Sequence, residues 1–221
     1  HLRGCKFASS AYIMSPALEG AFTMVMGHHS YHHDTSAFPY SYLIEKEGHS
    51  HLMPGANLTS FGAVRDIEKW PSRDRRTVCR DIINFEEYNP YVAGAMLEAV
   101  NILHELEERD PDAQVYTYNK AIIRATALRR GLKLYNKAIV AALGAMLGKG
   151  GFDPHYDGSG SWLDLAGQYI TRREVAAILD AVDRGELTTP AAVDNRFRVF
   201  AVHYDDYAHS WAEGIYASQL R

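Results

Sequence analysis

The chain has 221 residues, of which 47% are hydrophobic and 23% are charged. This length and composition predict one globular domain of ordinary size or two small ones, and they exclude wholesale disorder. Basic residues number 23 and acidic residues 27, for a formal net charge of −4. Because nucleic-acid-binding proteins are usually basic, we expect no nucleic-acid partner.

Two further features concern the environment of the chain. The longest nearly uninterrupted apolar stretch, residues 138–147, is too short to span a bilayer, so we expect no membrane partner. The two cysteines, Cys5 and Cys79, cannot make the disulfide framework of a small secreted domain. We therefore expect a reducing compartment and a cytoplasmic location.

The composition changes near residue 85 and predicts an α+β chain in three parts. Residues 1–63 are expected to be β-rich, because short apolar runs such as 22–26 alternate with turns rich in Gly, Pro and Ser. Residues 64–88 mix basic and acidic side chains and are interpreted as a linker. Residues 89–221 are rich in Ala, Leu, Glu, Arg and Lys and are expected to be helical.

Apolar residues in the first part recur every six positions, at Phe7, Ile13, Val25 and Tyr31. A six-residue period suits a left-handed parallel β-helix, in which each edge of a coil is a short strand. Glu19 interrupts the series, and other apolar spacings fit almost as well. The β-helix is therefore an interpretation that this spacing favours only weakly.

Start and stop signals predict a four-helix region from residue 89 onward. Asn89-Pro90 suits the start of a first helix, which Asp110-Pro111 ends. A second helix is expected over about residues 113–147, where apolar residues recur at helical spacing. The capping box T-R-R-E at 171–174 and Thr189-Pro190 predict the third and fourth. Four helices with short connections form a bundle or an orthogonal array.

Histidines are concentrated in one segment: six of the 11 lie between residues 28 and 51. Imidazole is a common ligand of transition metals, so this segment predicts a metal site, with zinc or iron as the candidate. On a strand, two histidines two residues apart project to the same side. The candidate ligands are His29, His33, Asp34, His49 and His51.

Two alternatives to a metal remain open for the same segment. One of His28, His29, His32 and His33 could act as a catalytic or substrate-orienting base without a metal. The imidazoles could instead pack in a polar turn region or at a subunit contact. The spacing matches no strict zinc signature. The chemical alternatives all require the rings to converge on a shared point.

Arginines and a tryptophan form a second candidate site, for substrate binding. Arginine binds phosphate or carboxylate with two parallel hydrogen bonds, and tryptophan stacks on planar groups. The candidate residues are Trp70, Arg73, Arg75 and Arg76. Acidic residues alternate with them, so ion pairs that hold the linker in place are the competing interpretation.

Two later segments also carry polar residues. Residues 162–168 alternate apolar and polar side chains, which predicts a short strand or extended arm before the third capped helix. On a helix, His203 and Asp206 are three residues apart, and Asp205 and His209 are four apart, so each pair can meet. Aromatic residues on the same stretch favour a packing role for that face.

Several short strings together resemble the C-terminal portion of an uncharacterised bacterial family found in Bacteroidetes and spirochaetes. Members of that family carry hexapeptide repeats that form a left-handed β-helix, followed by a helical region. The strings lie at residues 6–9 (KFAS), 38–43 (FPYSYL), 52–55 (LMPG), 69–76 (KWPSRDRR) and 162–168 (WLDLAGQ).

The resemblance implies that residues 1–63 are the last coils of a β-helix whose earlier coils lie outside this sequence. Hexapeptide-repeat proteins are often trimeric acyltransferases, in which a histidine deprotonates the acceptor at a subunit interface. The resemblance therefore implies a homo-oligomer, a trimer if β-helical, that transfers an acyl group to a small-molecule sugar or nucleotide-sugar acceptor. The implied general base is one of His28, His29, His32 and His33. The chain departs from the family in that its hexapeptide run is barely visible. Alternatives from other classes are a metal-binding protein and a non-catalytic oligomeric assembly protein.

Overall fold

The computed structural model describes residues 3–150 and 152–219. Its contacts divide the chain into two compact units: unit 1 is His1–Arg73 with Ala95–Val140, and unit 2 is Asp74–Gly94 with Ala141–Arg221. The described residues form six α-helices and several small sheets, so the fold is a mixture of helix and sheet as predicted. In this described part, no helix combines the length and the apolar character needed to cross a bilayer.

Unit 1 begins with short strands that pair in parallel in three separate sheets. Residue partners along these pairs are 16 or 18 positions apart, as in Lys6↔Met24, Tyr12↔His28 and Leu18↔Asp34. The strands are β1 (Lys6–Phe7) with β4 (Met24–Met26) and β7 (Tyr42–Lys46), β2 (Tyr12–Ile13) with β5 (His28–His29), and β3 (Leu18–Glu19) with β6 (Asp34–Thr35). The prediction of short strands separated by turns in this part is confirmed.

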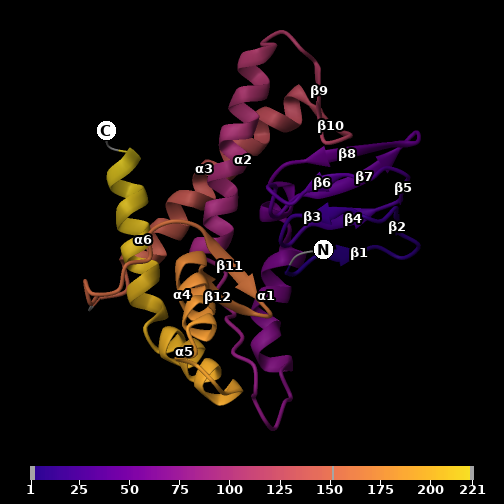
Figure 1. Cartoon of the computed structure of the whole chain (residues 1–221). Helices are drawn as coiled ribbons and strands as arrows, with labels where there is room; N and C mark the ends of the chain where they lie inside the picture. The colour runs from indigo at the N-terminus through magenta and orange to yellow at the C-terminus, as the bar shows by residue number, and fades with distance from the viewer. Residues whose placement is uncertain (1–2, 151, 220–221) are drawn as a thin grey trace. The chain divides into compact units, whose positions relative to one another are not determined.

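One of these sheets extends to six strands, in the order β1-β4-β7-β8-β10-β9 (Figure 1). Strand β8 (His49–Met53) forms an antiparallel hairpin with β7. Strand β10 (Ala121–Arg124) joins β8 in parallel and pairs antiparallel with β9 (Val115–Tyr118). Residues 6–53 and residues 115–124, which are far apart in the sequence, therefore contribute strands to the same sheet.

The β9–β10 hairpin corrects the prediction of a helix over residues 113–147. The helix α3 is shorter, Ala125–Leu147. Residues 115–118 are β-branched or tyrosine, and residues 122 and 123 are isoleucine, which favours strands. Asn119 and Lys120 both have positive φ, as a tight hairpin turn of the favoured hand requires. The apolar residues of this segment also have helical spacing. The β-propensity of the strand residues and the positive φ values of the two turn residues nevertheless favour a hairpin over a helix.

Three helices supply the rest of unit 1: the whole of the first, and most residues of the second and the third. The chain leaves β8 through a 3₁₀ turn (Ala56–Thr59) into α1 (Phe61–Arg73), so residues 64–73 of the expected linker are helical. Helix α2 (Pro90–Arg109) begins where predicted, because the Asn89 side chain accepts a hydrogen bond from the Val92 amide at 2.9 Å. The core contains apolar side chains that are almost wholly buried, including Val25, Phe38, Leu43, Leu52, Leu103, Ile123 and Leu128.

Unit 2 is built on a hairpin and three helices: β11 (Trp162–Leu165), β12 (Gln168–Thr171), α4 (Arg172–Asp183), α5 (Pro190–Val202) and α6 (Tyr204–Gln219). The two predicted N-caps are confirmed, since the hydroxyls of Thr171 and Thr189 accept from backbone amides three residues on. The last predicted helix is in fact two, α5 and α6, which meet at His203. Two aspartates in the first turn of α6 favour a new helix N-terminus there. The described part after residue 89 therefore contains five helices where four were expected.

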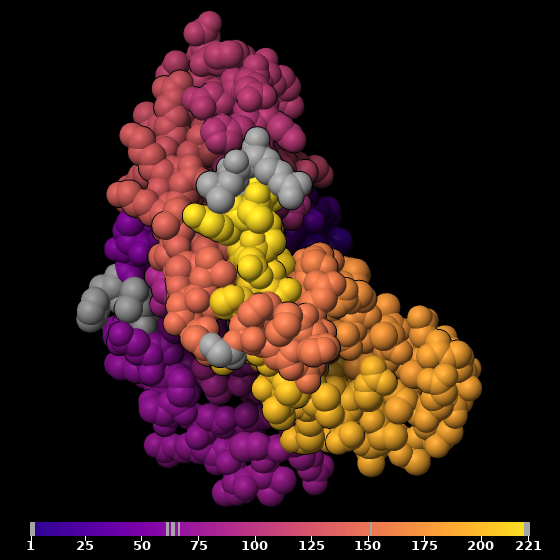
Figure 2. All heavy atoms as spheres, turned by 90° about the vertical axis from the view of Figure 1, so that its left-hand side faces the viewer, coloured from indigo at the N-terminus to yellow at the C-terminus, as the bar shows by residue number. Residues whose placement is uncertain are grey.

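The loop before β11 packs on α6 within unit 2, and Figure 2 shows the two segments side by side. The Asp153 amide donates to Asp206 at 2.9 Å, and the Gly158 amide donates to Ser210 at 3.3 Å. The indole of Trp162 in turn donates to the Gly158 carbonyl at 2.9 Å. This glycine-rich loop is therefore held by hydrogen bonds to the last helix and to the hairpin.

Candidate functional site

The imidazoles of the histidine-rich segment alternate between the inside and the outside of unit 1. His28 and His32 are exposed, whereas His29 and His33 are 0% and 2% exposed. For the neighbours on β5, the alternation follows from the strand itself, in which successive side chains point to opposite sides. His28 stacks on Tyr12 of the paired strand, with ring centroids 5.6 Å apart. The four candidate bases therefore do not share one environment.

His29 is fully hydrogen-bonded inside unit 1. Its Nε2 lies 3.0 Å from the carbonyl of Met26, and its Nδ1 lies 2.8 Å from the hydroxyl of Ser50. A carbonyl can only accept, so in the neutral ring Nε2 carries the proton and Nδ1 accepts from Ser50. Burial lowers the pKa of His29 below its ordinary value, which favours this neutral form. Both ring nitrogens are engaged by the protein.

His33 lies beside His29 but has different surroundings. The two rings meet edge to face, with centroids 5.6 Å apart. The Nε2 atom of His33 lies 3.6 Å from Oε1 of Glu19, and neither His33 nitrogen has a hydrogen-bond partner. Glu19 is itself buried, at 2% exposed, and is the residue that interrupts the six-residue apolar series. The sequence analysis missed Glu19, although a carboxylate at an apolar position was the available signal.

The other predicted metal ligands are engaged elsewhere or exposed. Asp34 accepts two hydrogen bonds from Ser36, through its amide at 2.9 Å and its hydroxyl at 2.5 Å. His49 is exposed, and His51 is half-buried, where burial and then Arg124 lower its pKa. Across residues 3–150 and 152–219, no three His, Cys, Asp or Glu side chains are grouped so as to hold a metal ion.

The predicted arginine site is divided between the two units. Trp70 and Arg73 lie on α1 in unit 1, and Arg75 and Arg76 follow in unit 2, where both are exposed. Arg76 pairs with Asp74, Nη2 to Oδ2 at 2.7 Å, and hydrogen bonds from Arg76 lower the pKa of Asp74 to about 2. Arg76 is therefore paired with an acidic neighbour in its own segment.

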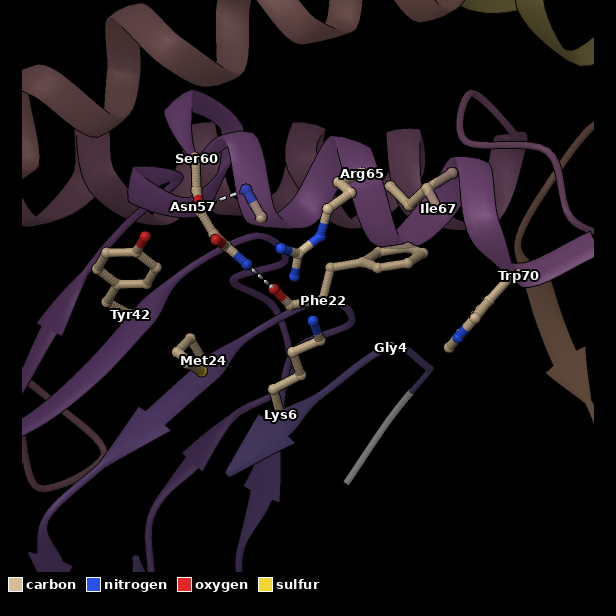
Figure 3. A pocket seen from close by; sticks show the side chains of 11 residues that line it. Gly4, Lys6, Phe22, Met24, Tyr42, Asn57, Ser60, Arg65, Ile67 and Trp70 are labelled. Carbon is tan, nitrogen blue, oxygen red and sulfur yellow. Dashed lines mark hydrogen bonds between the residues drawn. The ribbon is translucent and has the colours of Figure 1, made fainter. Parts of the chain in front are cut away.

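Trp70 belongs to a pocket of unit 1 that lies between α1 and the strands β1, β4 and β7 (Figure 3). Figure 3 shows Lys6 of β1 and Arg65 of α1 with their cationic ends in the space between helix and strands. The residues that line it are Gly4, Lys6, Phe22, Met24, Tyr42, Asn57, Ser60, Gly62, Arg65, Ile67 and Trp70. Its volume is about 170 Å³.

Phe22 forms one wall of this pocket in a backbone conformation unusual for its residue type. Its φ is 59°, in the left-handed region that favours glycine. The ring stacks on Tyr40, with centroids 4.8 Å apart, and the Asn57 side chain donates to the Phe22 carbonyl at 2.7 Å. A side chain at Gly4, whose φ is 70°, would overlap the Phe22 ring. The Phe22 ring can therefore occupy this position only because residue 4 is a glycine.

Two of the described residues that line the pocket, Lys6 and Arg65, are cationic. Burial lowers the pKa of Lys6, and the charges of Arg65 and Arg73 lower it further. Of the predicted residues, Trp70 lines the pocket, and Arg73 is close enough for its charge to act on Lys6. Sequence reasoning missed Lys6 and Arg65, because a lysine on a two-residue strand carries no local signal that it faces a helix 59 positions later.

In unit 2, one of the two predicted histidine–aspartate pairs forms. Nδ1 of His203 lies 3.3 Å from Oδ2 of Asp206, and Nε2 lies 3.0 Å from the hydroxyl of Tyr156. Asp205 pairs instead with Lys149 at 2.6 Å, and His209 stacks on a phenylalanine of the preceding loop. These contacts fasten the loop to α6.

Comparison with known proteins gives two family matches. Residues 2–107 match the family described as "Domain of unknown function (DUF4954)". This range includes the histidine-rich segment and the residues that line the pocket. Residues 152–221 match the family described as "Domain of unknown function (DUF6819)", which includes α4, α5 and α6. No curated protein matches the chain. No solved structure matches it.

Proposed function

We propose that the chain is part of a hexapeptide-type transferase that moves an acyl group to a hydroxyl or amine of a sugar or nucleotide-sugar acceptor. The observation that carries this proposal is the set of three parallel pairings in unit 1. Partners 16 or 18 residues apart suit the coil of a β-helix with three edges of about six residues each. The proposal therefore treats residues 3–46 as the last coils of such a β-helix.

His28 and His32 are the proposed general bases, because they are the exposed members of the predicted set. The imidazole takes the proton of the acceptor as the acceptor oxygen or nitrogen bonds to the acyl carbon of a thioester. The carbon–sulfur bond then breaks, and the leaving thiolate receives that proton from the imidazolium. His29 and His33 are buried and have no role in contacting substrate in this scheme.

A homo-oligomer, with three subunits if the β-helix is correct, is part of the same proposal. Large apolar side chains are exposed on the short strands and turns of unit 1, including Tyr12, Leu18 and Tyr31. A contiguous exposed apolar patch marks a contact surface, and we propose that these side chains form one. Two of them, Tyr12 and Tyr31, lie near His28 or His32 in the pairing or in the sequence, which supports a base near a subunit contact.

An acyl-transfer assay on the full chain tests the proposal. The probes are acetyl-coenzyme A as thioester donor and a panel of nucleotide sugars as acceptors, with thiol release as the readout. We expect release that depends on the acceptor, and a loss of about 10²–10⁴-fold in His28→Asn or in His32→Asn. His104→Asn is the matched control, because His104 is exposed on α2. Full activity in both site variants would contradict the assignment.

A second candidate function, binding of a transition metal such as zinc or iron, has one observation in its favour. His33 and Glu19 are buried with nitrogen and oxygen atoms that lack hydrogen-bond partners. Two ligands are fewer than the three or four protein ligands of most zinc sites. Elemental analysis of untagged protein, with His33→Ala as the comparison, tests this candidate. Equal metal content in both proteins would count against it.

A further inference from the structure

We infer that an open pocket of unit 1, between the β3–β6 strand pair and the β9–β10 turn, holds the acceptor of the proposed transfer. In this pocket His32 is the base, and Lys120 is a positioning residue that binds a phosphate of a nucleotide-sugar acceptor. The inference rests on the proposed function, which it narrows to one site, one of the two exposed histidines and the phosphorylated class of acceptor.

The floor of the pocket is the outward face of two paired strands. Strands β3 and β6 pair in parallel with Leu18 opposite Asp34, and the Leu18 amide donates to the His33 carbonyl at 3.0 Å. Successive side chains of a strand point to opposite sides, and the next residues, Glu19 and Thr35, are buried. Leu18 and Asp34 therefore lie on the outer side, where both line the pocket.

The turn between β9 and β10 supplies the opposite wall. The Asn119 side chain donates to the Asp34 carbonyl at 3.0 Å, which fixes the turn beside β6. Asn119 and Lys120 both line the pocket, with φ of 42° and 68°. Lys120 is exposed, and no ion pair within the described part of the chain involves it. Its ammonium group can therefore bind an anionic group of a ligand.

The pocket distinguishes the two exposed histidines. His32 lines it, whereas His28 lies on the β2–β5 strand pair and stacks on Tyr12. In the proposed reaction, His32 takes the proton of the acceptor hydroxyl or amine as that oxygen or nitrogen bonds to the acyl carbon of the thioester. The carbon–sulfur bond breaks, and the leaving thiolate receives the proton.

The floor suits a sugar ring. Pro16, Ala17 and Leu18 give an apolar surface that the carbon face of the ring can cover. Beside it, both hydrogen bonds that Asp34 accepts from Ser36 end on Oδ1. Because an ionised carboxylate accepts through both oxygens, Oδ2 can accept from a sugar hydroxyl.

The charges and the size favour a sugar that carries a phosphate. Among the described lining residues, Asp34 is the acidic side chain and Lys120 the basic one, beside the two histidines. A neutral ring at Asp34 with a phosphate at Lys120 matches both, since lysine acts on phosphate as a point charge. The pocket volume of about 610 Å³ lies within the roughly 300–1,000 Å³ of small-molecule sites. It therefore has room for both parts.

Calorimetric titration of the full chain with UDP-glucose, without a thioester donor, tests the site separately from the reaction. We expect one saturable site in the micromolar to millimolar range. Methyl glucoside keeps the ring and lacks the phosphates, and it should bind at least about threefold more weakly. Equal affinities for the two ligands would overturn the role of Lys120, and no binding of UDP-glucose would overturn the site.

Variants locate the site. Lys120→Gln should weaken UDP-glucose binding by roughly threefold to tenfold, a range that allows for the screening of an exposed charge. Lys120→Arg keeps the charge and should retain the affinity. Lys133→Gln is the matched control, because Lys133 is exposed on α3 of the same unit and does not line the pocket. Circular dichroism confirms that each variant is folded. Unchanged affinity in Lys120→Gln would overturn the inference.

The transfer assay separates the failure of the site from the failure of the reaction. Lys120→Gln should raise KM for the nucleotide sugar by the same factor and leave kcat within about twofold. His32→Asn should bind UDP-glucose within about threefold of wild type and lose about 10²–10⁴-fold in kcat. Binding that depends on Lys120, without thiol release from any acceptor, would support the site and contradict the transfer. Thiol release with an unchanged KM in Lys120→Gln would support the transfer and overturn the site.

Discussion

Tyr135 shows how one side chain can fasten a helix to a turn. Its ring is wholly buried, and its hydroxyl donates to the Pro39 carbonyl at 2.7 Å and accepts from the Gly55 amide at 2.9 Å. Burial raises the pKa of Tyr135 well above its ordinary value, so the phenol stays protonated and can donate. One hydroxyl therefore hydrogen-bonds to two backbone groups, which the Ser41 hydroxyl also contacts, at 3.4 Å from the Pro39 carbonyl and 3.3 Å from the Gly55 amide.

Replacement Tyr135→Phe should reduce the free energy of unfolding by about 1–3 kcal/mol, because it leaves a buried carbonyl and a buried amide without this partner. Urea denaturation measures the change. Tyr216→Phe is the control, since Tyr216 is exposed on α6, and its effect should stay within about 0.5 kcal/mol. Equal stability of the two variants would show that the Ser41 hydroxyl replaces the Tyr135 hydroxyl at no cost.

At the scale of an element, α3 carries two glycines with opposite surroundings. A Cβ at Gly131 would lie 2.7 Å from the Cβ of Pro54, whereas a Cβ at Gly144 would have nothing within 4 Å. Helix propensity alone treats both as weak points of the helix. The structure explains the glycine at position 131, because α3 approaches the turn after β8 so closely there that a Cβ has no room.

Gly131→Ala should therefore destabilise the protein by about 1–3 kcal/mol through overpacking, despite the better helix propensity of alanine. Gly144→Ala should stabilise it by roughly 0.5–1 kcal/mol, because only propensity changes there. Chemical denaturation of both variants gives the comparison. A gain of stability in both would mean that the backbone around Pro54 yields easily.

The elements also show what the sequence could and could not predict. The N-caps at Asn89, Thr171 and Thr189 were predictable because a cap is a local hydrogen bond. The hairpin at 115–124 was missed because tyrosines, valine and isoleucines satisfied a helical spacing as well as a strand. The pocket under α1 was missed in part because Lys6 and Arg65 meet only through tertiary packing.

At the scale of the whole molecule, four titratable groups with lowered pKa values change the stability of the fold in the same direction as the pH falls. The pKa values of His29 and His51 are lowered, chiefly by burial, and those of Asp74 and Asp157 are lowered to about 2 by arginine hydrogen bonds. A group whose folded pKa is depressed binds more protons when unfolded, so its contribution to stability is lost as pH falls.

The melting temperature should therefore fall in two steps on acidification. The first step begins below roughly pH 6.5, where the histidines of the unfolded chain take up protons and His29 does not. The second begins below about pH 4, as protonation of the unfolded chain removes the contribution of the two aspartates. About 0.5 M salt should weaken the second step, because those ion pairs are exposed, and leave the first, because His29 is buried. Replacement His29→Gln should shrink the first step, whereas His28→Gln, at an exposed ring, should retain it. A first step that is unchanged in His29→Gln would assign it to other groups.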